Sequence, residues 1–115
     1  MSTLKTNTIK NTDDVEMYLA KAWVNFNGTG TVAIRAAGNV SSITDNGTGD
    51  YTVNFTISMP DANYSAITDC GFSTTNPSTV FSTSVPVDSG SLRIDCNSTS
   101  GVATDREFVT ATIFR

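Results

Sequence analysis

Acid–base chemistry in this chain would have to come from aspartates such as Asp45, Asp50, Asp61, Asp88 and Asp105. Two carboxylates are enough to hydrolyse a glycosidic bond, but most of these aspartates lie in turn-like contexts, where the carboxylate typically binds backbone amides. The chain contains no histidine, which excludes Ser-His-Asp and Cys-His arrangements and histidine-based metal sites. We therefore expect no catalytic residue and no enzyme activity.

The DNGTGD segment at 45–50 is the one place where a metal ion is worth considering. Asp45, Asn46 and Asp50 supply the hard oxygen atoms that calcium prefers, but their spacing is not that of an EF-hand loop. Asn46-Gly47 between strand-like segments is instead typical of a hairpin turn. Two Gly-Thr-Gly triplets are not phosphate loops, because neither precedes a Lys or opens a helix. The sequence predicts a plain turn here, and no cofactor.

Two cysteines, Cys70 and Cys96, lie in separate predicted strands. We interpret them as reduced, partly buried thiols, since a disulfide would need Cα atoms within about 7 Å and an oxidising compartment. Whether they are bonded stays open from the sequence alone. Metal binding by two cysteines without histidine is not expected.

The aromatic residues fit either a core or a surface on which sugar rings stack. Trp23 is adjacent to alternating apolar positions, so we interpret it as a core residue. The same interpretation applies to Tyr51 and the phenylalanines. Tyr64, beside the turn at Pro60, is the aromatic residue that we expect to be most exposed.

Charge and hydropathy exclude several function classes. The net charge is −4, with eleven acidic residues against seven basic residues that are scattered along the chain. A nucleic-acid binder needs a basic stripe instead, and an anionic membrane surface is disfavoured for the same reason. No apolar run approaches the roughly 20 residues that span a bilayer, and the opening residues do not form a signal peptide. We expect neither nucleic-acid binding nor membrane insertion.

Short strands separated by turn residues account for most of the chain. The clearest runs from 51 to 59, where apolar residues at odd positions alternate with Thr, Asn and Ser before Pro60 ends the strand. The other predicted strands lie at 22–26, 31–35, 39–44, 65–68, 79–85, 91–96 and 107–114. This pattern predicts an all-β fold: an antiparallel, jelly-roll-like β-sandwich of about eight short strands.

We expect residues 1–20 to form an amino-terminal arm and residues 21–115 to form the β-sandwich domain. Segment 12–20 fits either a helix of two turns or a strand that continues toward Trp23. Apolar residues on both faces of 107–114 indicate a central strand or one against another subunit. The apolar fraction, 38%, is low for a monomer of this length, so we expect contacts between identical subunits.

The central stretch of the chain resembles a known kind of module. Residues 22–64, above all AWVNFNGTG, the IR at 34–35, NVSSITDNGTGDYTVNFT and MPDANY, closely resemble a carboxyl-terminal module of tail-fibre and other appendage proteins from marine and cyanobacterial bacteriophages. The LKTNTI opening and the terminal IFR extend the likeness weakly. In those proteins a long shaft precedes the module. Here only a short segment precedes residue 22, so we expect a short fibre, a fibre tip or a capsid-surface knob.

The resemblance implies a virion structural protein that is made in the host cytoplasm and assembles as a homotrimer. Its arm, residues 1–20, would contact the particle or a neighbouring subunit, and outward loops would contact host cell-surface glycan or protein. No catalytic, cofactor-binding or metal-binding residue carries over, and the binding residues stay unknown.

Three functions follow as hypotheses. The leading one is a tail-fibre or receptor-binding appendage subunit that mediates host attachment. The alternative is a capsid decoration or head-fibre protein. A small glycan-active enzyme is the third, and the lack of histidine and of a convincing acid pair weighs against it.

Overall fold

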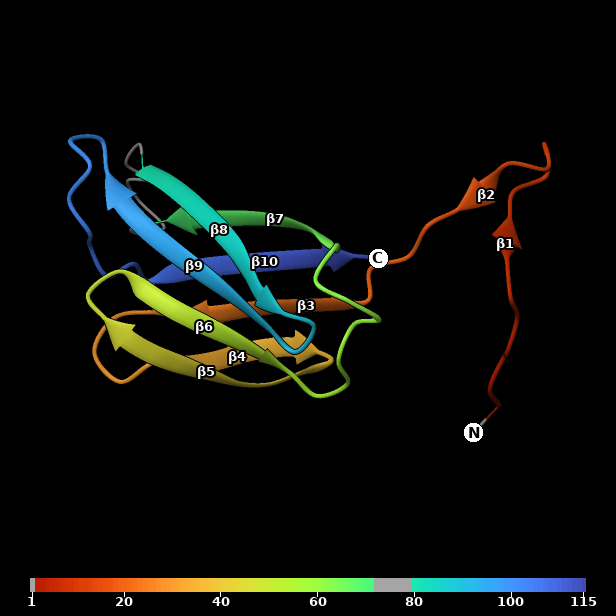
Figure 1. Ribbon diagram of the computed structural model, residues 1–115, viewed down its shortest axis with the longest axis horizontal. Coiled ribbons are helices and arrows are strands. Elements are labelled where there is room, and N and C mark those ends of the chain that lie inside the picture. The colour runs from red at the N-terminus through yellow and green to blue at the C-terminus, as the bar shows by residue number, and fades with distance from the viewer. Residues whose placement is uncertain (1, 72–79) are drawn as a thin grey trace.

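The computed structural model describes residues 2–71 and 80–115, and within them the chain is all-β. Two four-stranded antiparallel sheets pack face to face, and a short hairpin projects from one end of the sandwich (Figure 1). The predicted antiparallel β-sandwich is confirmed. Of the two interpretations of segment 12–20, the helix is wrong, because Glu16 and Met17 pair with Lys10 and Ile9 as strands.

The eight strands of the sandwich correspond to the eight predicted ones. The first sheet has the order β4 (Ala33–Gly38), β3 (Ala22–Asn27), β10 (Phe108–Phe114) and β7 (Ser65–Gly71). The second sheet has the order β5 (Val40–Gly47), β6 (Asp50–Phe55), β9 (Ser91–Ser98) and β8 (Val80–Asp88). The hairpin consists of β1 (Ile9–Lys10) and β2 (Glu16–Met17). Residue 79, the predicted start of β8, lies outside the described residues, and β10 is central as expected.

The strand predicted at 51–59 ends earlier, at Phe55, which corrects that prediction. Asn39 stands at the corner between β4 and β5 in the left-handed region, with φ 56°. Its side-chain oxygen accepts a hydrogen bond from Ile57 N at 2.7 Å, and its backbone oxygen accepts one from Thr56 N at 3.1 Å. These bonds draw the chain out of the sheet, so Ile57 is 72% exposed instead of buried.

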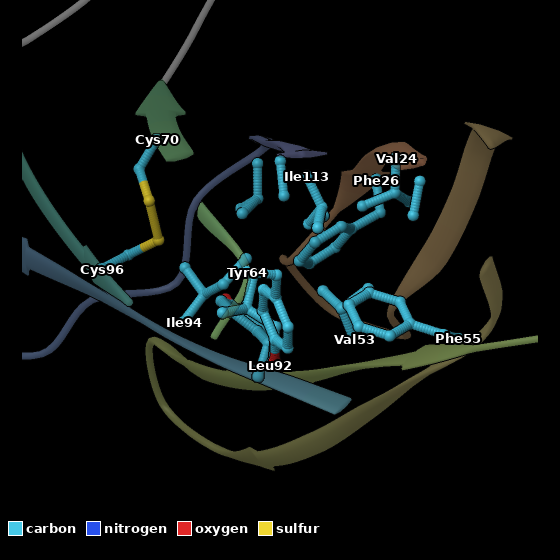
Figure 2. Packing of buried hydrophobic residues seen from close by; sticks show 14 of the residues in the cluster. Val24, Phe26, Val53, Phe55, Tyr64, Cys70, Leu92, Ile94, Cys96 and Ile113 are labelled. Atoms are coloured by element: carbon cyan, nitrogen blue, oxygen red, sulfur yellow. A yellow bond between two sulfur atoms is a disulfide. The ribbon is translucent and has the colours of Figure 1, made fainter. Parts of the chain in front are cut away.

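The hydrophobic core lies between the two sheets, where alternate residues of the strands meet (Figure 2). The rings of Phe26 and Tyr51 pack edge to face with centroids 5.3 Å apart, and those of Phe55 and Tyr64 pack likewise at 5.6 Å. Each such pair adds about 0.5–1.5 kcal/mol to the energy of burial. The inward residues of the four central strands are Ala22, Val24, Phe26, Tyr51, Val53, Phe55, Leu92, Ile94, Cys96, Val109, Ala111 and Ile113.

A disulfide between Cys70 of β7 and Cys96 of β9 joins the two sheets (Figure 2). The prediction of two reduced thiols is therefore wrong. Both cysteines occupy inward positions, and sheet packing brings their Cα atoms to 6.2 Å, inside the range that a disulfide spans. Nearby, Ser82 Oγ of β8 donates a hydrogen bond to Thr68 O of β7 at 2.8 Å, so polar and covalent contacts close this side of the sandwich.

Candidate binding surfaces at the two ends of the sandwich

The strands run along the sandwich, so its connections gather at two opposite ends (Figure 1). The arm, the carboxyl terminus and the segment between β6 and β7 lie at one end. The loop after β3, the turn after β5 and the segment before β10 lie at the other. We call these last three segments, at 28–32, 47–49 and 99–107, the distal loops.

A buried hydrogen-bonded cluster holds the distal loops together. The hydroxyl of Tyr51 lies 2.8 Å from Gly28 O and 3.0 Å from Asp105 Oδ1, and it shares its one proton between these two acceptors. Asp105 Oδ1 also accepts a hydrogen bond from Gly49 N at 2.8 Å. Backbone bonds add to the cluster, because Gly28 N donates to Arg106 O at 2.8 Å. Tyr51 and Asp105 together thus connect all three loops.

The Tyr51 phenol stays protonated and neutral across the physiological range. Burial raises its pKa, and the hydrogen bond to the Asp105 carboxylate raises it further. A neutral phenol is the form that donates, so Tyr51 keeps its donor role at neutral pH.

Two glycines let the loops approach this cluster closely. A Cβ at Gly28 would lie 2.8 Å from Arg106 O, and a Cβ at Gly49 would lie 2.6 Å from both Cys96 O and Thr104 N. Gly49 also has φ +66°, which L side chains rarely adopt. The loops are therefore fixed by backbone contacts that tolerate no larger residue.

The turn at 45–50 is a hairpin turn, as predicted, and several of its polar side-chain atoms are already hydrogen-bonded. Asp45 Oδ1 accepts a hydrogen bond from Gly47 N at 3.0 Å, and Asn46 Nδ2 donates to Thr52 Oγ1 at 2.8 Å. Both oxygens of Asp50 bind Arg93, at 2.9 and 2.5 Å. In the described part of the chain, no group of three or more His, Cys, Asp or Glu residues is placed to hold a metal ion.

One pair of carboxylates lies side by side on the outer face of the second sheet. Asp50 of β6 is directly opposite Asp95 of β9, and Arg93 lies within 3.8 Å of Asp95 as well. Its guanidinium holds the pKa of Asp50 below the usual value. A glycosidase acid needs a raised pKa, and Asp50, with its lowered pKa, instead forms an ion pair with Arg93.

The remaining turn aspartates do what the sequence predicted of them. Asp61 accepts a hydrogen bond from Asn63 N, and Asp88 accepts one from Gly90 N, each two residues further along the chain. Asp61 also forms two hydrogen bonds with Arg115, at 3.0 and 2.8 Å, which lower its pKa to about 2.

Predictions for three aromatic residues, Trp23, Tyr64 and Phe81, are wrong. Phe81 of β8, interpreted as a core residue with the other phenylalanines, is 55% exposed. Trp23 is 44% exposed, because Ala22, Val24 and Phe26 point into the core and the residues between them must point outward. Tyr64 is only 6% exposed, and its hydroxyl donates to Ser91 O at 2.7 Å. Burial raises the pKa of Tyr64 to about 12. The parity of β3 was a signal in the sequence that could have placed Trp23 correctly.

The arm carries large apolar side chains that this chain does not cover. Ile9 lies directly opposite Met17 in the hairpin, so both point to the same face. Val15, Tyr18 and Leu19, which flank or follow this strand, are exposed as well. Hydrogen bonds within the turn stabilise it, since Asn11 Oδ1 accepts them from the backbone N of residues 13 and 15. The arm is a formed hairpin that exposes large apolar side chains.

No helix in the described residues is long and apolar enough to cross a membrane. Comparisons of the chain with protein-family models, with curated proteins and with solved structures found no match. A function for this chain is therefore proposed from its residues, its geometry and the sequence resemblance of residues 22–64.

Proposed function

We propose that this chain is a structural subunit of a phage virion, a tail-fibre or receptor-binding appendage that mediates attachment to the host cell. The observation that carries the proposal is that two different surfaces lie at opposite ends of the sandwich (Figure 1). One end carries the arm with its exposed apolar side chains, and the other carries loops that are held in place by hydrogen bonds. An attachment subunit needs one end that stays on the particle and another that meets the cell. The resemblance of residues 22–64 to appendage modules supports the same function.

The distal loops suit a binding role because their conformation is set before any ligand arrives. Tyr51 and Asp105 fix the three loops relative to one another through hydrogen bonds of 2.8–3.0 Å. A surface that is already ordered loses less conformational entropy on binding, which improves affinity for the same contacts. The Thr and Ser side chains of these loops match a host glycan or a polar protein surface.

The disulfide supports the proposal that the protein functions outside the cytoplasm. Cross-links such as Cys70–Cys96 form and persist in oxidising surroundings and are rare in reducing ones. A virion protein made in a host cytoplasm reaches such surroundings when the particle is released.

Capsid decoration is the second candidate, because the same two-ended subunit would serve on a head as well as on a tail. A glycan-active enzyme is disfavoured by the low pKa of Asp50, which suits an ion pair with Arg93. Incubation with host polysaccharide tests the enzyme: release of reducing ends would revive it.

Immunogold labelling of particles with antibodies against the sandwich tests the leading proposal. We expect label on the tail or its fibres. Label confined to the capsid would replace the tail assignment with capsid decoration, and unlabelled particles in a preparation that contains the chain would overturn both. In a complementary experiment, deleting residues 1–20 should leave the circular dichroism of the β domain unchanged and abolish incorporation into particles. Normal incorporation of the truncated chain would show that the arm is not the anchor.

A further inference from the structure

An open cavity of about 670 Å³ lies at the arm end of the sandwich, beside the segment that connects β6 to β7 (Figure 1). Small-molecule sites in proteins have volumes of roughly 300–1,000 Å³, so the cavity is large enough to hold a ligand. Ile57, Met59 and Pro60 form its apolar wall, and Lys21 and Arg115 bring two basic side chains to it. It combines an aliphatic surface with positive charge.

The cavity forms where β6 ends early, and one side chain holds its parts in place. Asn39 Nδ2 donates hydrogen bonds to Lys21 O and to Ile57 O, both at 3.0 Å, and Asn39 Oδ1 accepts one from Ile57 N at 2.7 Å. One amide group thus fixes the backbone of a basic residue relative to that of an apolar residue. Ile57 is 72% exposed, although the alternation of its strand predicts burial. Departures of this kind from the sequence pattern concentrate at functional sites.

The two basic side chains differ in how they are paired. Arg115 forms two hydrogen bonds with the Asp61 carboxylate, at 3.0 and 2.8 Å, which neutralise its charge. Among the described residues, no carboxylate lies within ion-pair distance of Lys21 Nζ. The cavity therefore carries one positive charge without a counter-ion beside its apolar wall. Such a surface is complementary to a ligand with one negative charge and a hydrocarbon part.

We propose that this cavity binds an aliphatic monocarboxylate, with the carboxylate on Lys21 Nζ and the hydrocarbon chain against Ile57 and Met59. The apolar wall is aliphatic and offers no aromatic ring for stacking. An extended peptide is a poorer fit, because Thr56 N, Ile57 N and Ile57 O already bond to Asn39 and cannot pair with another strand. The inference goes beyond the proposed function and does not depend on it, since it concerns the purified chain and no virion.

Titration of the full chain with sodium octanoate, followed through amide shifts in nitrogen-15 spectra, tests the proposal. We expect saturable shift changes at residues 21, 39 and 56–59, with a dissociation constant on the order of 1 mM for so small a ligand. Octanamide has the same chain length without the charge, and we expect it to bind roughly 10-fold more weakly. Shift changes confined to other residues, no saturation by roughly 10 mM octanoate, or equal affinity for the two ligands would overturn the proposal.

Two pairs of variants separate the charge from the apolar wall. Lys21→Gln should weaken octanoate binding by roughly 10-fold and leave octanamide binding unchanged, because only the charge is lost. Its control, Lys5→Gln, removes the same charge from the arm and should change neither. Ile57→Ser should weaken both ligands by roughly 10-fold. Its control, Ile67→Ser, alters a similarly exposed residue, 65% against 72%, on the outer face of the first sheet and should weaken neither. Equal effects within either pair would overturn the proposal.

Discussion

Removing the disulfide should destabilise the sandwich more than any other conservative change. The bond joins residues 26 positions apart and links β7 of one sheet to β9 of the other. In the chain-entropy model, a closed loop of this length stabilises the folded state by about 3.5 kcal/mol at 25 °C, by restricting the unfolded chain. A domain of this size has a total stability of about 5–15 kcal/mol, so the loss would be a large fraction of it.

The change to make is the double variant Cys70→Ala/Cys96→Ala. We expect it to remain folded at room temperature, with its thermal midpoint lowered by about 10–20 °C. In urea, the transition followed by far-ultraviolet circular dichroism should move to lower concentration. Its slope should rise, because the unfolded chain without the bond exposes more surface.

Reduction supplies the control for this prediction. Adding a thiol reductant should bring the wild-type transition toward that of the double variant and leave the variant itself unchanged. If the free energy of unfolding of the variant is within about 1 kcal/mol of that of the oxidised wild type, the disulfide between the two sheets contributes little to the stability of this chain.

Three further changes probe single interactions. Tyr51→Phe removes the hydroxyl that holds the distal loops and should cost about 1–3 kcal/mol in urea unfolding, because Gly28 O loses this donor and Asp105 Oδ1 keeps only the bond from Gly49 N; a cost near zero would mean that water replaces the hydroxyl. Gly49→Ala should cost about 1–3 kcal/mol more than Gly30→Ala, since both have a positive φ but only Gly49 faces close backbone atoms; equal costs would show that the loops move aside. Asp61 has a pKa of about 2 in the folded chain against an ordinary 3.8, so its contribution to stability is present above pH 3.8 and lost as pH falls through 2. A carbon-13 titration should show this pKa rise toward 3.8 in Arg115→Gln, and an unchanged value would remove the ion pair as its cause.

Alternation along each strand was enough to predict most of the sandwich. In β6 the inward residues recur at every second position, so the sequence identifies both the strand and its buried face. In β10 the sequence identifies the strand, but apolar residues on both faces leave its buried face open. The role of the turn aspartates was equally predictable, because Asp45 and Asp88 bind backbone amides only two residues away. Such local features depend on spacing along the chain and need no knowledge of topology.

Features that join distant segments were not predictable in the same way. Tyr51 and Asp105 are 54 residues apart, and their contact depends on which strands are neighbours in the folded sheets. The same holds for Cys70 and Cys96, whose pairing requires that β7 and β9 face each other. The early end of β6 also escaped prediction, since it depends on Asn39 at a corner 18 residues before Ile57.

A cryo-electron microscopy map of the particle that carries this chain tests the central claim most directly. The account predicts sandwiches that project from a tail or fibre, with the arm toward the particle and the loops around Tyr51 and Asp105 facing outward. A map in which those loops are buried against the particle while the arm points into solvent would contradict it.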